Sequence, residues 1–168
     1  HKVAFNTMRQ ISSMKIISHR GNLNGSESWL ENKPEQIDRC INLGYDVEID
    51  LNYDPITTIF WLGHDSHDYR VSWKWIANRH KQLWIHCKDI TTLHEFTKYK
   101  NAGYQYFWHQ KDDFTLTSNN YIWTYPGKSY TPDSIMVMPE KFMNISEIKN
   151  LKVYDCFGVC TDYPSELK

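Results

Sequence analysis

The chain has 168 residues, which is the usual size of one domain. Hydrophobic residues make up 40% of it and aromatic residues 15%, enough for a sizeable core, so a disordered chain is excluded. The 19 Lys and Arg residues nearly balance the 20 Asp and Glu residues, which argues against a general binder of nucleic acids or of anionic membranes.

No apolar stretch approaches the ~18–20 residues of a membrane span, so we expect no transmembrane segment. The four cysteines (Cys40, Cys87, Cys156 and Cys160) form no Cys-x-x-Cys pair, and no secretory signal is visible. A reducing, cytoplasmic location is the simpler expectation. Residues 1–13 show no periodicity, and we expect them to be an N-terminal extension or remnant outside one domain at 14–168.

Eight short β-type runs follow in chain order, at 15–18, 46–51, 59–63, 83–87, 105–108, 121–124, 134–138 and 158–161. Helical patterns separate several of them, at 35–43, 72–79, 91–101 and 144–151, with Asn144 or Ser146 as the cap of the last. This alternation predicts a parallel sheet, and eight strands favour a compact (β/α)8 TIM-type barrel over an open doubly wound sheet. Such barrels usually need ~250 residues, so we expect some outer helices to be missing or shortened, at 111–120 and 127–133.

Ionisable residues mark the ends of the first strands. Glu48 and Asp50 alternate with apolar residues, so both project from one face of their strand. His86 and Lys88 repeat this pattern two strands later, His64 follows the intervening strand, and His19 and Arg20 follow the first. In a barrel of this type the carboxyl ends of the strands form the active site, so we expect these side chains to meet there.

Each of these pieces also has a simpler explanation. The His-Arg-Gly segment suits a solvated turn, His64 suits a core histidine with satisfied hydrogen bonds, and His86 with Lys88 suits an exposed strand edge. Two buried carboxylates on one strand are harder to explain without a cation, because their burial alone is costly. The placement of all four pieces at successive strand ends favours one shared site, with carboxylates for a divalent cation and imidazoles for proton transfer.

Six motifs stand in a recognisable order: His19-Arg20-Gly21, Glu31-Asn32 ahead of a helix, Glu48-Ile49-Asp50, Gly63-His64-Asp65, a strand ending in Lys88, and the segment Gly158–Pro164. In order and spacing they resemble the glycerophosphodiester phosphodiesterase family over nearly all of residues 14–168. The stretch from 65 to 83 is shorter than that family's usual inserted region. His86 stands where the family carries a glutamate.

The resemblance implies a TIM barrel that holds a divalent metal ion, Mg²⁺, Ca²⁺ or Mn²⁺. It implies His19 and His64 as the catalytic acid and base, and Glu48 and Asp50 as metal ligands, with His86 in the third ligand position. Arg20 and Lys88 would contact phosphate, and Glu31 would support the site. We also predict substrate contacts from His109 and Trp123, although packing is an alternative explanation for an aromatic residue such as Trp123.

These expectations favour a metal-dependent phosphodiesterase that acts on glycerophosphodiesters or a related small phosphodiester. One histidine would deprotonate a neighbouring hydroxyl and the other would protonate the leaving oxygen, giving a cyclic phosphate that water then opens. The alternatives are a lyase resembling the sphingomyelinase D branch, which releases the cyclic phosphate, and a catalytically silent barrel that binds a phosphorylated ligand or a partner protein. Exposed sheet segments make a homodimer possible.

Overall fold

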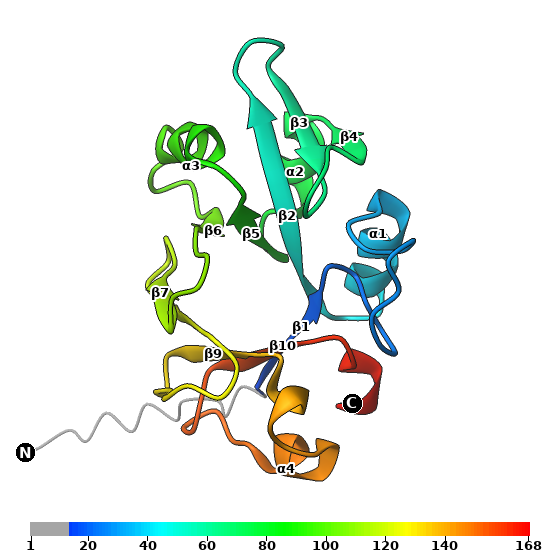
Figure 1. The fold of residues 1–168 in the computed structure, drawn as a ribbon, viewed down its shortest axis with the longest axis vertical. Helices are drawn as coiled ribbons and strands as arrows, with labels where there is room; N and C mark the ends of the chain where they lie inside the picture. Colours follow the sequence, from blue (N-terminus) through cyan, green and yellow to red (C-terminus); the bar gives the residue numbers. More distant parts are fainter. Residues whose placement is uncertain (1–13) are drawn as a thin grey trace, which may run out of the picture.

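The computed structural model describes residues 14–168 (Figure 1), so the expectation for residues 1–13 lies outside the described part of the chain. The described strands are β1 (Lys15–His19), β2 (Asp46–Asp54), β3 (Ile59–Leu62), β4 (Tyr69–Val71), β5 (Leu83–Cys87), β6 (Gln105–Phe107), β7 (Phe114–Leu116), β8 (Ile122–Thr124), β9 (Ser134–Val137) and β10 (Gly158–Thr161). The described helices are α1 (Pro34–Asn42), α2 (Trp73–Arg79), α3 (Ile90–Thr97) and α4 (Ile145–Asn150), with 3-10 turns η1 (Pro139–Lys141) and η2 (Pro164–Glu166).

The strands form one mixed sheet that curls into a half-barrel (Figure 1). Its parallel part runs β6-β5-β2-β1-β10-β9-β8. β3 and β4 extend the sheet beyond β2 in antiparallel fashion, and β7 pairs antiparallel with β8. All strands of the parallel part therefore point their carboxyl ends toward one side of the curled sheet.

The prediction of a (β/α)8 TIM-type barrel is wrong. The predicted run at 59–63 is not a barrel strand, because its strand β3 turns back on β2 and places Leu62 opposite Leu51. Only residues 55–58 connect these two strands, whereas a parallel crossover needs about a dozen residues. Within residues 14–168, no ladder joins β6 to β7 or β8; a loop contact, in which the backbone N–H of Ser118 donates to the carbonyl of Tyr106, spans this gap instead.

The positions of the individual strands and helices agree with the sequence-based predictions better than the topology does. All eight predicted β-type runs contain a strand, although β4 and β7 were not predicted. All four predicted helices are present, and 111–120 and 127–133 contain none. The helix starts have clear causes: the side chains of Ser72, Asp89 and Asn144 accept hydrogen bonds from the backbone of Trp75, Thr92 and Glu147 at the caps of α2, α3 and α4.

The sheet packs apolar side chains on both of its faces. Outward-facing Val47, Ile49 and Leu51 of β2 are fully buried in a cluster with residues of α1, α2 and α3. A second cluster under α4 includes Met136 and Ile148. The concave face holds a third cluster made of Ile17, Trp84, Phe107, Trp123, Ile135, Val137, Met138 and Cys160. Because side chains alternate along β2, Glu48 and Asp50 must therefore face the concave side.

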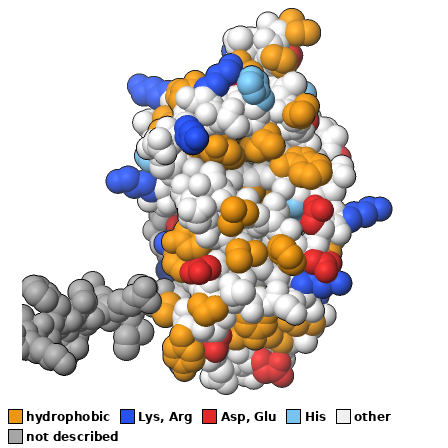
Figure 2. All heavy atoms as spheres, turned by 90° about the vertical axis from the view of Figure 1, so that its left-hand side faces the viewer, with side chains coloured by type: hydrophobic (Ala, Val, Ile, Leu, Met, Phe, Trp, Pro, Cys, Tyr) orange, Lys and Arg blue, Asp and Glu red, His pale blue; other side chains and the backbone are white. Residues whose placement is uncertain are grey.

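No helix within residues 14–168 is long and apolar enough to cross a membrane. All four cysteines are free and buried. Hydrophobic side chains gather in several patches on the face seen in Figure 2. The edge strand β7 carries two exposed ones, Phe114 and Leu116, and the expectation of a homodimer stays a prediction.

Candidate functional site

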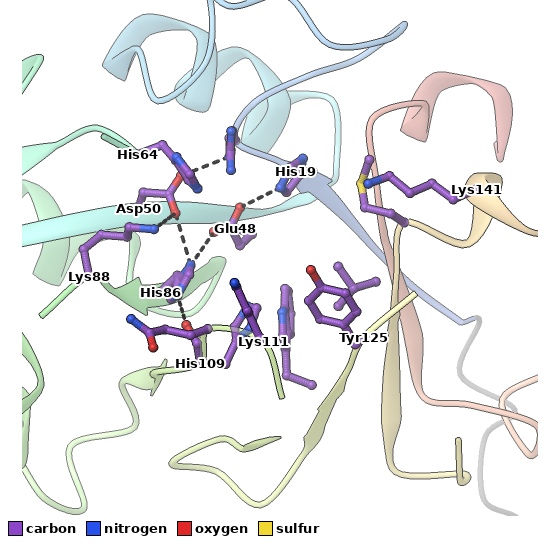
Figure 3. Close-up of a pocket in the computed structure, with 15 residues that line it drawn as sticks. His19, Glu48, Asp50, His64, His86, Lys88, His109, Lys111, Tyr125 and Lys141 are labelled. Atoms are coloured by element: carbon purple, nitrogen blue, oxygen red, sulfur yellow. Dashed lines mark hydrogen bonds and ion pairs between the residues drawn. The ribbon is translucent and has the colours of Figure 1, made fainter. Parts of the chain in front are cut away.

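A cavity of about 640 Å³ opens at the carboxyl ends of the parallel strands (Figure 3). It brings together nine of the ten residues predicted for the site. The cavity is lined by His19, Arg20, Glu48, Asp50, His64, His86, Lys88, His109, Gln110, Lys111, Trp123, Tyr125, Val137, Met138 and Lys141. The ionisable side chains thus meet at one end of the sheet, although His64 comes from the antiparallel strand β3, and their roles stay predictions.

Glu48, Asp50 and His86 form a buried cluster at the bottom of this cavity. The register of the sheet causes it, since Asp50 of β2 lies beside His86 of β5. His86 Nδ1 lies 3.2 Å from Asp50 Oδ1 and 3.9 Å from Glu48 Oε1. One ligand atom from each of the three residues lies within 4.8 Å of the others, so the cluster can hold a metal ion.

Cationic and amide groups surround Asp50. Arg20 Nε lies 3.1 Å and Lys88 Nζ 3.9 Å from its carboxylate oxygens. Asn32 Nδ2 donates to Asp50 Oδ2 at 3.0 Å. Burial acts to raise the pKa of Asp50, but the His86 ring, the Arg20 guanidinium and the Asn32 amide outweigh it and hold this pKa well below its usual range. Asp50 is therefore ionised at neutral pH.

The pKa of Glu48 is shifted in the opposite direction to that of Asp50. Its full burial and the neighbouring charge of Asp50 raise the pKa of Glu48 to about 7, despite the nearby His19 and Arg20. Among the described residues, Glu48 Oε2 and Asp50 Oδ1 are buried oxygens without a hydrogen-bond donor. Buried carboxylate oxygens without donors are costly, and a divalent cation supplies the compensation that they lack. The donor set therefore fits a cation.

His19, at the end of β1, is held by a carboxylate on the neighbouring strand end. His19 Nδ1 donates to Asp162 Oδ1 at 2.8 Å, which leaves Nε2 on the side of Glu48 Oε2, 3.8 Å away. Burial acts to lower the pKa of His19, but the hydrogen bond to Asp162 and the charge of Glu48 raise it above its ordinary value. The Nε2 atom is thus the one available for proton transfer.

A second group of metal-type side chains, His19, Glu31 and Asp162, lies beside the first. Asn22 Nδ2 donates both to Glu31 Oε2 at 3.0 Å and to Asp162 Oδ1 at 2.9 Å. An N–H group pointing at both oxygens occupies the place that a cation would need. This group therefore positions His19 and does not fit a metal ion.

His64 reaches the cavity by an unexpected route. Because β3 runs antiparallel to β2, its end returns to Asp50, and the Gly63 N–H donates to the Asp50 carbonyl at 3.1 Å. Gly63 has a φ of 152°, and a Cβ there would lie 1.9 Å from the carbonyl oxygen of Ser66. This turn requires glycine, and it places His64, whose side chain is 39% exposed, at the cavity rim, where its Nδ1 lies 2.8 Å from Asp65.

The opposite wall is aromatic and basic. Trp123 is nearly buried and stacks on Phe107 with ring centroids 4.4 Å apart, so it lines the cavity while it packs the core. Burial and the neighbouring His86 lower the pKa of His109 to about 4, so His109 is neutral at pH 7. Lys111 and Lys141 also line the cavity, and Glu48 and Asp50 are the acidic residues among its described lining.

Glu31 is the predicted site residue that does not line the cavity. Its Oε2 atom lies 3.7 Å from Arg20 Nη1, so it lies behind that side chain. Sequence reasoning did not name Asn22, Asn32 or Asp162 as site residues. Asn32 and Asp162 belong to the motifs that carry the family resemblance, whereas no sequence signal marks Asn22.

Comparisons of the chain with protein-family models, with curated proteins and with solved structures found no match. The chemistry of the cavity is therefore inferred from its own residues.

Proposed function

We propose that this chain cleaves small phosphodiesters, glycerophosphodiesters among them, in a reaction that needs a divalent cation. The observation that carries the proposal is the shared cavity. The candidate metal ligands Glu48, Asp50 and His86 line this cavity. His19 and His64 line it too, as do the positively charged side chains of Arg20 and Lys88. Phosphodiester cleavage needs these same components: charge neutralisation at the phosphoryl oxygens and a pair of proton-transfer groups.

Glu48, Asp50 and His86 would hold the divalent cation, which offsets negative charge on the phosphoryl oxygens when bound. Arg20 and Lys88 are held near Asp50 at 3.1 and 3.9 Å, so their positive charges stay at the same end of the cavity. They bind and orient the anionic phosphodiester there.

In the proposed reaction His64 removes the proton from a substrate hydroxyl next to the phosphodiester. That oxygen attacks phosphorus, the bond to the leaving oxygen breaks, and His19 Nε2 gives its proton to the leaving oxygen. The raised pKa of His19 supports its role as the acid, because it favours the protonated ring. Water then opens the cyclic phosphate with the two roles reversed.

The basic wall limits the group attached to the phosphate. Lys111 and Lys141 add two positive charges to the lining of the cavity. They favour a neutral or anionic headgroup over a quaternary ammonium, because like charges repel.

Incubation of the protein with glycerophosphodiesters, with Mg²⁺, Mn²⁺, Ca²⁺ or Zn²⁺ added in turn, tests the proposal by ³¹P NMR. A metal-dependent monoester signal is expected. A cyclic phosphate that accumulates without opening would instead identify a lyase. No turnover of any diester with any metal would leave ligand binding as the function and contradict the proposal.

A further inference from the structure

We infer that His86 is a metal ligand through Nδ1, so that its site with Glu48 and Asp50 takes a transition-metal ion such as Mn²⁺ or Zn²⁺ in preference to Mg²⁺ or Ca²⁺. The inference rests on the proposed function only in placing a cation at the two carboxylates. It concerns the class of the ion and the atom that selects it.

The hydrogen bond on the far side of the ring decides which nitrogen is available. His86 Nε2 donates to the carbonyl oxygen of His109 at 3.2 Å. A carbonyl oxygen only accepts hydrogen bonds, so Nε2 carries a hydrogen whether the ring is neutral or charged. Nδ1 is therefore the one ring nitrogen that can offer a lone pair to a cation.

Nδ1 faces the two carboxylates directly. It lies 3.2 Å from Asp50 Oδ1 and 3.9 Å from Glu48 Oε1. Despite the short distance, Asp50 Oδ1 has no hydrogen bond of acceptable geometry from any described residue. Two oxygens and one nitrogen thus point toward a common position, as Figure 3 shows, which is the arrangement of three ligands around one ion.

The ring of His86 is also fixed in orientation. It is 9% exposed and stacks against Phe107, with a centroid distance of 5.4 Å, and against His109, with a distance of 4.6 Å. The interplanar angles are 10° and 13°. A histidine whose second nitrogen donates to a carbonyl group and whose ring packs against two other rings is oriented for coordination before the ion arrives.

The donor types then select the ion. Ca²⁺ and Mg²⁺ prefer oxygen ligands alone, and Mg²⁺ binds mainly through carboxylates and water. Imidazole nitrogen instead suits Zn²⁺, Fe²⁺ and other first-row transition ions, among which Mn²⁺ binds most weakly. One buried imidazole among two carboxylates therefore moves the preference of the site away from the hard cations.

Two measurements test this inference on the purified full chain. Calorimetric titration with Mn²⁺ and Mg²⁺ gives the affinity ratio for the wild type and for His86→Glu, which replaces the nitrogen by a carboxylate. Electron spin-echo envelope modulation of bound Mn²⁺ detects a directly coordinated nitrogen. His94→Gln is the matched control, because it removes an exposed imidazole of α3 outside the cavity. His86→Gln replaces His86→Glu if the latter fails to fold.

The wild type and His94→Gln should show nitrogen coupling to Mn²⁺, and the coupling should be lost in the His86 variants. The ratio of Mn²⁺ to Mg²⁺ affinity should fall by roughly 10-fold or more in His86→Glu, the scale on which ligand surroundings alter metal affinity. A wild type that binds Mn²⁺ without nitrogen coupling, or an unchanged ratio, overturns the inference while leaving the phosphodiesterase proposal intact. Nitrogen coupling without any phosphodiester turnover supports the inference and contradicts that proposal instead.

Discussion

Asn32 holds Asp50 with both ends of its amide: Asn32 Nδ2 donates to Asp50 Oδ2 at 3.0 Å, and the Asp50 backbone N–H donates to Asn32 Oδ1 at 2.9 Å. Asn32 precedes α1 and is 1% exposed, and its φ of 60° lies in the left-handed region that asparagine tolerates. This pair links the loop after β1 to the middle of β2. It therefore fixes one of the two carboxylates at the bottom of the cavity.

Replacing Asn32 by glycine should remove both hydrogen bonds without adding backbone strain, since glycine accepts a positive φ. The free energy of unfolding should fall by about 2–3 kcal/mol, because one bond reaches an ionised carboxylate and both are buried. Asn120→Gly is the matched control, since Asn120 has a φ of 66° but is exposed. Equal losses in the two variants by urea denaturation would contradict a structural role for the Asn32 amide.

His19→Gln and His64→Gln should each lower phosphodiester turnover by at least ~10²-fold, which is the lower end of the contribution of acid and base groups. His19 Nε2 faces Glu48 and His64 lines the same cavity. His80→Gln is a suitable control, because His80 lies outside this cavity. The assignment fails if both variants retain near-full activity on a diester that the wild type cleaves.

Lys111→Met and Lys141→Met should weaken binding of a substrate whose headgroup carries a carboxylate. Each exposed charge contributes up to about 1 kcal/mol, so KM should rise roughly 2–5-fold. A matched diester that ends in a quaternary ammonium should show no rise. Lys128→Met serves as the control, since Lys128 pairs with Asp113 and does not line the cavity. Equal effects on both headgroups would count against the basic wall as a source of selectivity.

The cap of α3 gives a prediction for stability against pH. Burial acts to raise the pKa of Asp89, but hydrogen bonds from Thr92 and Thr91 hold this pKa below its ordinary value. Because the folded pKa is lowered, the stabilisation is present above the unfolded pKa of about 4 and is lost as the pH falls through the folded value. Asp89→Ala should therefore lower the free energy of unfolding by about 1 kcal/mol at pH 7 and by less at pH 3.

Ser72→Ala is the control for this experiment, because the Ser72 hydroxyl caps α2 with a hydrogen bond of 3.0 Å and carries no charge. Thermal or urea unfolding at several pH values measures both variants. The difference between Ser72→Ala and the wild type should not vary with pH. A cost of Asp89→Ala that stays constant down to pH 3 would show that the carboxylate charge is not involved.

Much of the local structure was predictable, because it depends on patterns within short segments. The alternation at Val47–Leu51 shows which side chains of β2 face the cavity, and Asn144 marks the start of α4. The direction in which neighbouring strands pair was not predictable from these patterns, because parallel and antiparallel strands can have the same sequence pattern. The short connection at 55–58 is the signal that could have identified a hairpin.

Most residues that line the candidate site were predictable from the sequence. The residues that hold them in place by hydrogen bonds were less so. Charged residues such as Glu48 and Asp50 are conspicuous in an apolar strand, and their partners lie at strand ends. Asn22 is different, because a single polar residue in a loop has no pattern of its own. Its contacts with Glu31 and Asp162 connect residues 9 and 140 positions away, and only the folded chain brings them together.

The most direct test of the central claim follows one glycerophosphodiester by ³¹P NMR in the presence of Mn²⁺, with the wild type, with the wild type in excess EDTA, and with Asp50→Asn. Asp113→Asn, which alters an exposed carboxylate outside the cavity, is the control variant. We expect the diester signal to convert to a monoester signal with the wild type and with Asp113→Asn, and we expect EDTA or Asp50→Asn to stop the conversion. Equal conversion in EDTA or with Asp50→Asn, or none with the wild type, would contradict this expectation.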